Sequence, residues 1–250
     1  GIELFNGQMA DLDPPTESTV ICAAGKTDLA WCETHPIETW QANVVDPIEL
    51  ARRTLRRADR YVHLSSGCVW NGPYNEDGRP FEPRDPVSPR CFYAWTKAAC
   101  DALLMQEPEW SRIAILRLRQ PYSPMQSPRN LLSKLLAYEK LIDTPNSMTS
   151  ADTVVRTIRT LLDDGQLYGR VTNVYDAGVS SPLAVGKLLA EAGLRPAPEQ
   201  LDKSDLDKWH KPQRVDTVVK DSFFEKVVRP PRVEDELRRV IKLYAADTMG

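Results

Sequence analysis

The feature that most limits the fold is a regular alternation of short apolar segments with helical segments. Residues 18–25, 60–70 and 112–119 are apolar runs with strand character. Such continuous apolarity is typical of strands that a parallel sheet buries on both faces. Residues 38–58 have helical periodicity, and residues 91–104 begin another helix. Strands that alternate with helices at this spacing predict an α/β fold with a doubly wound parallel sheet.

In the second half of the chain strands and helices no longer alternate regularly, which indicates a second structural region. Residues 149–180 contain a helical pattern that Gly165 would end, followed by one more strand that returns to the sheet. We therefore predict a sheet domain made of residues 1–120 together with 149–180. Residues 121–148 and 181–250 are expected to form a smaller lid.

Composition and charge argue against several classes of protein. A chain of 250 residues with 42% apolar side chains can bury a sizeable core. The net charge of -3 comes from 32 basic and 35 acidic residues without long like-charge blocks, so neither nucleic acid nor a membrane is an expected partner. Five cysteines without CxxC spacing and three scattered histidines argue against a disulfide framework and a metal site. We therefore expect a cytoplasmic protein.

A candidate catalytic set lies where two of these elements meet. Ser65 and Ser66 end an apolar strand, and reactive groups in open α/β sheets gather beyond the carboxyl ends of strands. Tyr93 precedes Lys97 by one helical turn. A phenol has a pKa near ~10, and a neighbouring ammonium favours the phenolate. We expect Lys97 to lower the pKa of Tyr93, although a tyrosine and a lysine at this spacing also occur by chance.

Several motifs follow one another in the order found in a known family. They are "CAAGKTD", "HLSSGCVWNG", "YAWTK" and "LRLRQPYSP". Over nearly its whole length the chain resembles the extended short-chain dehydrogenases/reductases, and within them the sugar-nucleotide branch with dTDP-4-dehydrorhamnose reductase and the NAD-dependent epimerases. The resemblance implies a Rossmann-like sheet, NAD or NADP as cofactor, and a nucleotide-linked keto sugar that is reduced or epimerised. It also implies that the lid binds the substrate.

The resemblance assigns roles to particular residues. Tyr93 would transfer a proton, Lys97 would lower the pKa of Tyr93, and Ser66 would orient the substrate oxygen. The spacing to Val69 selects Ser66 over Ser65. The expected cofactor-binding residues are Asp11, Ala23, Ala24, Gly25, Asn43, Tyr93, Lys97 and Pro121. The expected substrate-binding residues are Ser66, Cys68, Asn130, Lys211 and Arg214, the last two being equally compatible with a solvated basic turn. Relatives often dimerise through the helix that carries YxxxK and the helix before it, so a homodimer is implied.

One expected element is missing from the motifs. The family opens with a strand, a GxxGxxG turn and a helix whose N-terminal amides bind the pyrophosphate. This sequence begins at what corresponds to the third strand, at residues 2–7. We therefore expect an N-terminally incomplete sheet. The chain could be part of a longer enzyme, a natural short form with another role, or a chain whose sheet a partner completes, and the choice between NAD and NADP stays open.

A second departure from the family's sequence pattern reduces the number of reactions that fit. Dehydratase relatives have an acidic pair directly after the catalytic hydroxyl residue, whereas Gly67 and Cys68 stand here. A 4,6-dehydratase is therefore disfavoured. The alternative function is a non-catalytic regulatory or binding subunit on the same fold, resembling the regulatory subunit of methionine adenosyltransferase.

Two further side chains are expected to be structural, and the position of a third stays open. We expect His63 to be a hydrogen-bonded core histidine and Cys68 to pack in the interior. For Asp101, a surface position is as well supported as a role in the site.

Overall fold

A parallel sheet forms the centre of the protein. The computed structural model describes residues 15–56, 60–209 and 215–249. Within these residues the main sheet has the order β1-β2-β3-β7, with every neighbouring pair parallel. Its strands are β1 (Thr19–Cys22), β2 (Arg60–Ser66), β3 (Ile113–Leu118) and β7 (Arg170–Val174). The predicted α/β class is confirmed, and β7 returns to the sheet as expected. The strand predicted over residues 2–7 lies outside the described residues.

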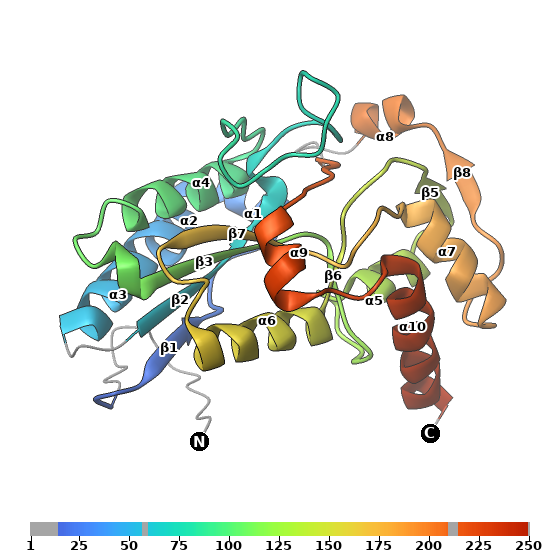
Figure 1. Cartoon of the computed structure of the whole chain (residues 1–250). Helices are drawn as coiled ribbons and strands as arrows, with labels where there is room; N and C mark the ends of the chain where they lie inside the picture. Colours follow the sequence, from blue (N-terminus) through green and yellow to red (C-terminus); the bar gives the residue numbers. More distant parts are fainter. Residues whose placement is uncertain (1–14, 57–59, 210–214, 250) are drawn as a thin grey trace.

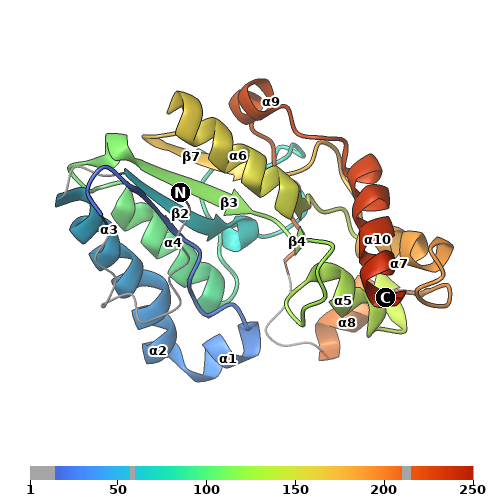
Figure 2. The same ribbon diagram turned by 90° about the horizontal axis from the view of Figure 1, so that it is seen from below.

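Helices cover both faces of this sheet and give three layers (Figures 1 and 2). One face carries α3 (Asp46–Arg56) and α4 (Phe92–Leu104), against which α1 (Leu29–Thr34) and α2 (Pro36–Trp40) pack. The other face carries α6 (Ala151–Asp164) and α9 (Ser222–Val228). The helix predicted over residues 38–58 is therefore α2, a π-helical turn (Gln41–Val45) and α3 in succession.

Alternating side chains of the strands fill a core on each face. Tyr61 and Ile115 point toward α3 and α4, where they join Leu104. Val62 and Leu116 are on the opposite face, packed with residues of α6 and α9. This alternation follows from the two-residue period of a strand, and each buried Leu or Ile stabilises the fold by about 1.5–3 kcal/mol.

The ends of α6 follow the expected capping rules. The Ser150 hydroxyl accepts a hydrogen bond of 3.1 Å from the Thr153 N–H, which satisfies one of the free donors of the first turn. At the other end Gly165 has a φ of 68°, and its N–H donates to the Leu161 carbonyl. The predicted helix end at Gly165 is confirmed, because only glycine adopts this backbone conformation without strain.

A third core lies beside the sheet, in the segments predicted to form the lid. It is built by α5 (Leu131–Leu136), α7 (Pro182–Glu191) and α10 (Val233–Met249). Two short parallel pairs border it: β4 (Pro121–Tyr122) with β6 (Thr149–Ser150), and β5 (Lys140–Ile142) with β8 (Glu199–Leu201), which leads into α8 (Lys203–Trp209). In contrast, α9 packs on the sheet. The division into two functional regions stays a prediction.

One predicted helix is shorter than expected. The sequence of residues 130–141 has a helical pattern that predicts one helix, but α5 ends at Leu136 and β5 begins at Lys140. The strand forms because β8, almost sixty residues further along, supplies its partner. Along the described ranges, no helix has both the length and the apolarity needed to cross a membrane.

Candidate active site

Ser66 and Tyr93 meet at the carboxyl end of β2. Ser66 is the last residue of that strand and precedes a short 3₁₀ turn (Gly67–Val69). Its Oγ accepts a 3.1 Å hydrogen bond from the Cys68 N–H within this turn. Tyr93 lies in the first turn of α4, with its phenol beside the Ser66 hydroxyl. Both side chains are largely buried, at 7% and 9% exposure. The structure therefore brings together the two predicted hydroxyl groups, whose roles stay predictions.

Burial determines the acidity of Tyr93. Removal of the phenol from water raises its pKa, the neighbouring Cys68 raises it further, and hydrogen bonding to Ser66 lowers it. The net shift is upward, opposite to the lowering that we expected from Lys97. Desolvation is the largest contribution, because it penalises the charged phenolate and Tyr93 is almost completely buried. Tyr93 is thus protonated at neutral pH, which suits a proton donor.

Lys97 is fixed between two strand ends. Its Nζ donates a 3.3 Å hydrogen bond to the carbonyl of Leu64, two residues before Ser66. A Cβ added to Gly25, which follows β1, would lie 3.8 Å from the same Nζ. The ammonium therefore stands between the ends of β1 and β2.

Asn43 links the end of β1 to α4. Its Oδ1 accepts from the Lys26 N–H at 2.8 Å, while its Nδ2 donates to the Lys26 carbonyl at 3.0 Å and to the Thr96 Oγ1 at 3.2 Å. Gly25 has a φ of 148°, and a Cβ there would approach Asn43 Oδ1 to 2.8 Å, so the position requires glycine. Gly25, Asn43 and Lys97, three predicted cofactor-binding residues, therefore lie together.

The chain after β1 is open enough to meet a nucleotide. Ala23 and Ala24 are exposed, and Gly25 is partly exposed. Such small side chains leave the backbone accessible beside the Lys97 ammonium. These residues thus fit the ribose of a dinucleotide, the group that the sequence motif predicts for this strand end.

Arg119 is a residue of this region that sequence reasoning missed. It follows β3, is almost fully buried, and donates from Nη1 to the Cys68 sulfur at 3.0 Å. Its Nη2 donates to the carbonyl of Val215 at 3.0 Å and to Asn146 Oδ1. A Cβ at Gly67 would lie 2.6 Å from the Arg119 Cδ. The available signal was an arginine at the end of an apolar strand together with a glycine directly after the candidate serine.

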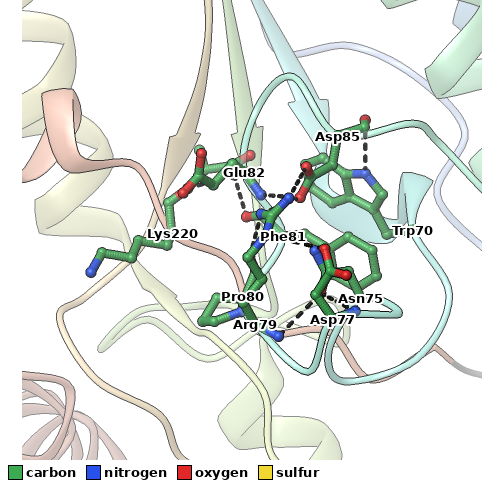
Figure 3. A network of polar contacts seen from close by, with 10 residues as sticks. Trp70, Asn75, Asp77, Arg79, Pro80, Phe81, Glu82, Asp85 and Lys220 are labelled. Atoms are coloured by element: carbon green, nitrogen blue, oxygen red, sulfur yellow. Dashed lines mark hydrogen bonds and ion pairs between the residues drawn. The ribbon is translucent and has the colours of Figure 1, made fainter.

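The long loop before α4 is held by its own polar network (Figure 3). Arg79 and Asp85 form a bidentate ion pair with distances of 2.8 and 3.0 Å. The Trp70 indole donates to the Asp85 carbonyl at 3.3 Å and stacks on Phe81. The Phe81 backbone in turn bonds to the C-terminal segment before α9. This network fixes the loop to the turn that follows Ser66.

Two other predicted binding residues lie on the segments that follow β3, and three lie outside the described residues. Pro121 begins β4 and is exposed. Asn130 caps α5, and its Nδ2 donates to the carbonyls of Ser123 and Met125 at 2.8 and 2.7 Å, so main-chain groups occupy its amide. Those outside the described residues are Asp11, Lys211 and Arg214.

Two expectations for buried side chains need correction. His63 is in the core, as expected, but within the described residues neither ring nitrogen has a hydrogen-bond partner. Burial and the nearby Lys97 charge lower its pKa, so the ring is neutral. Asp101 is fully buried, and its Oδ2 accepts a 2.8 Å hydrogen bond from Arg117 Nε. A surface position for Asp101 is therefore wrong, because its side of α4 faces β3.

No three His, Cys, Asp or Glu side chains gather as a metal site in the part of the chain that the structure describes.

Comparisons with known proteins bear on the family and the fold. The family model described as NAD dependent epimerase/dehydratase family matches residues 12–141, slightly more than half of the chain. A bifunctional dTDP-4-dehydrorhamnose 3,5-epimerase/dTDP-4-dehydrorhamnose reductase from Arabidopsis thaliana is 34% identical over 152 residues, which are 58% of this chain and 50% of that protein. The match thus spans about half the length of this relative.

Two solved structures resemble the fold closely. The UDP-rhamnose synthase from Acanthamoeba polyphaga mimivirus superposes with a TM-score of 0.81 at 20% identity, covering 90% of this chain and 82% of that one. MoeE5 in complex with UDP-glucose and NAD gives a TM-score of 0.78 at 19% identity, covering 98% and 86%. At these identities the likeness shows the fold alone.

Proposed function

Because this chain belongs to the NAD dependent epimerase/dehydratase family, we propose that it reduces or epimerises a nucleotide-linked keto sugar through Ser66, Tyr93 and Lys97. The convergence of predicted site residues at the carboxyl ends of β1 and β2 carries this proposal. Ser66 lies beside Tyr93, and Lys97 lies beside Gly25 and Asn43, although these residues come from separate parts of the sequence. The Arabidopsis relative, by its name an epimerase and reductase of a dTDP-linked dehydro sugar, supports the substrate class.

The proposed chemistry uses the acid form of Tyr93. A bound NAD or NADP would exchange a hydride with the sugar. Tyr93, which its raised pKa keeps protonated at neutral pH, donates a proton to the carbonyl oxygen of the sugar. Ser66 orients the same oxygen by a hydrogen bond, and the fixed Lys97 ammonium favours the negative charge that forms there.

The cofactor and the substrate would contact different residues around Ser66, Tyr93 and Lys97. Ala23, Ala24 and Gly25 would contact the dinucleotide, with Lys97 at its ribose and Asp11 and Pro121 as further contacts. We assign substrate binding to the region of residues 121–148 and 181–250, which builds its own core beside the sheet. Cys68 accepts a hydrogen bond from Arg119, whose Nη2 donates to Asn146 Oδ1 and to the Val215 carbonyl in this region.

The test is turnover with matched serine variants. The protein is mixed with NADH or NADPH and a panel of UDP- and dTDP-linked 4-keto sugars, and the loss of nicotinamide absorbance is followed. Ser66→Ala should slow turnover by roughly 10²-fold, the size expected for one lost oxyanion donor. Ser65→Ala, one residue away, should leave it nearly unchanged. Dinucleotide binding without turnover of any sugar would instead support the non-catalytic alternative.

A homodimer through α4 is part of the proposal. Trp95 and Leu103 on this helix are 53% and 45% exposed, and the Trp95 ring lies 5.8 Å from that of Trp40. Exposed apolar groups gathered on one helix face are typical of an interface. In light scattering, Trp95→Glu should give monomers, while Val155→Glu on α6 should not. A wild-type monomer at all concentrations would contradict this interface.

A reducing compartment such as the cytoplasm also belongs to the proposal. All five cysteines are free thiols in the structure. Disulfides are rare in such compartments, where they are usually transient.

A further inference from the structure

Three thiols from three separate segments surround the candidate catalytic tyrosine. Cys32 lies in α1, Cys68 lies in the turn after Ser66, and Cys91 caps α4. Cys32 and Cys91 form one buried cluster with Tyr93, and Cys68 packs against this cluster. The proposed hydride transfer has no use for a group of thiols, so their arrangement calls for a separate explanation.

The three thiols differ in how soluble reagents can reach them. Cys68 is partly exposed, whereas Cys32 and Cys91 are buried. The Cys68 sulfur also accepts a hydrogen bond from the Arg119 guanidinium at 3.0 Å. Reactive cysteines are typically found in such partly exposed, positively charged surroundings. Cys68 is therefore the thiol that a dissolved oxidant meets first.

Cys91 is the best placed partner for Cys68. Burial raises the pKa of Cys91 to about 11, and Cys91 belongs to the buried cluster against which Cys68 packs. The backbone supports this pairing, because the Ser88 N–H donates to the Val69 carbonyl at 2.8 Å. The segment that leads to Cys91 thus runs beside the segment that follows Cys68.

We propose that Cys68 and Cys91 form a reversible disulfide when the protein meets a peroxide. Hydrogen peroxide first oxidises the Cys68 thiol to a sulfenic acid, as its O–O bond breaks and water leaves. The Cys91 sulfur then attacks the Cys68 sulfur, the S–O bond breaks, and the hydroxyl departs with the Cys91 proton as a second water. A dithiol reductant restores both thiols by exchange.

The bridge would act directly on the candidate site. It would tie the turn after Ser66 to the first turn of the helix that carries Tyr93. It would also remove the Cys68 sulfur from its contact with Arg119. We expect oxidation to stop the proposed reaction reversibly, although formation of the bridge can be measured without any activity.

Peptide mapping of the whole chain tests this proposal. The protein is treated with hydrogen peroxide, free thiols are blocked with iodoacetamide, and a non-reducing digest is analysed by mass spectrometry. We expect a peptide pair joined through Cys68 and Cys91 that disappears after dithiothreitol. Cys32→Ala should keep this pair, whereas Cys91→Ser should abolish it and leave a Cys68 sulfenic acid that dimedone labels.

Two outcomes would overturn the proposal. One is a wild-type map in which Cys68 is oxidised but unbridged, and the other is a bridge that uses Cys32. Because this readout does not depend on catalysis, a protein inactive toward every sugar could still form the bridge. Conversely, an active enzyme without the bridge would refute only the disulfide between Cys68 and Cys91.

Discussion

The buried ion pair between Asp101 and Arg117 gives a stability prediction that the structure makes quantitative. Their side chains are 1% and 3% exposed, and Asp101 Oδ2 lies 2.8 Å from Arg117 Nε. Arg117 also donates to the Pro83 carbonyl and lies over the Trp70 ring. Asp101→Ala would therefore leave the buried Arg117 guanidinium without its counter-charge, while it still contacts Pro83 and Trp70.

The expected loss follows from the cost of an unpaired buried charge. Breaking such a pair by removing one partner costs about 3–5 kcal/mol of unfolding free energy. For a chain of this length, that corresponds to a fall of about 6–20 °C in melting temperature. The double variant Asp101→Ala with Arg117→Met removes both charges, so most of the loss should be recovered.

Urea unfolding followed by tryptophan fluorescence measures these free energies. The exposed pair of Glu191 and Arg238 is the matched control, since both side chains are more than half exposed. Glu191→Ala should cost about 0–1 kcal/mol. The reasoning is refuted if Asp101→Ala loses no more than Glu191→Ala, or if the double variant is as unstable as the single one.

Two further predictions concern the turn after Ser66 and the loop before α4. Gly67→Ala should destabilise the fold by about 1–3 kcal/mol in the same assay, because the new Cβ would lie 2.6 Å from Arg119 Cδ; an unchanged midpoint would show that Arg119 moves freely. Hydrogen bonding to Arg79 holds the pKa of Asp85 below its ordinary 3.8, so this contribution to stability is present above that value and is lost as the pH falls through the lower folded pKa. Asp85→Asn should therefore flatten the decline in unfolding free energy below about pH 4, and equal slopes for the two proteins would contradict this assignment.

Local patterns in the sequence were sufficient for the strands of the main sheet and for α3, α4 and α6. The apolar runs predicted β1, β2 and β3, and Gly165 correctly predicted the end of α6 because a left-handed helix end is a local requirement. The strand β5 was missed because it depends on β8, far away in the sequence. Periodicity cannot reveal such a partner.

The same distinction between local patterns and contacts across the fold applies to the candidate site. The motifs that resemble those of the family identified Ser66 and Tyr93, which the fold brings together. The direction of the pKa shift of Tyr93 could not be predicted, because burial of the phenol depends on the packing of α1 and α4. Burial of Asp101 was missed because its partner Arg117 lies on a different element. Contacts between elements, rather than residue types, decide these properties.

Turnover by the Tyr93→Phe variant tests the proton-donor role most directly. The substitution removes one hydroxyl and keeps the ring that packs against Cys32 and Cys91. With a keto-sugar nucleotide that the wild-type protein reduces, the variant should be slower by at least roughly 10²-fold, while dinucleotide binding measured by fluorescence stays the same. A variant that reduces the sugar at the wild-type rate would contradict the proposed role of Tyr93.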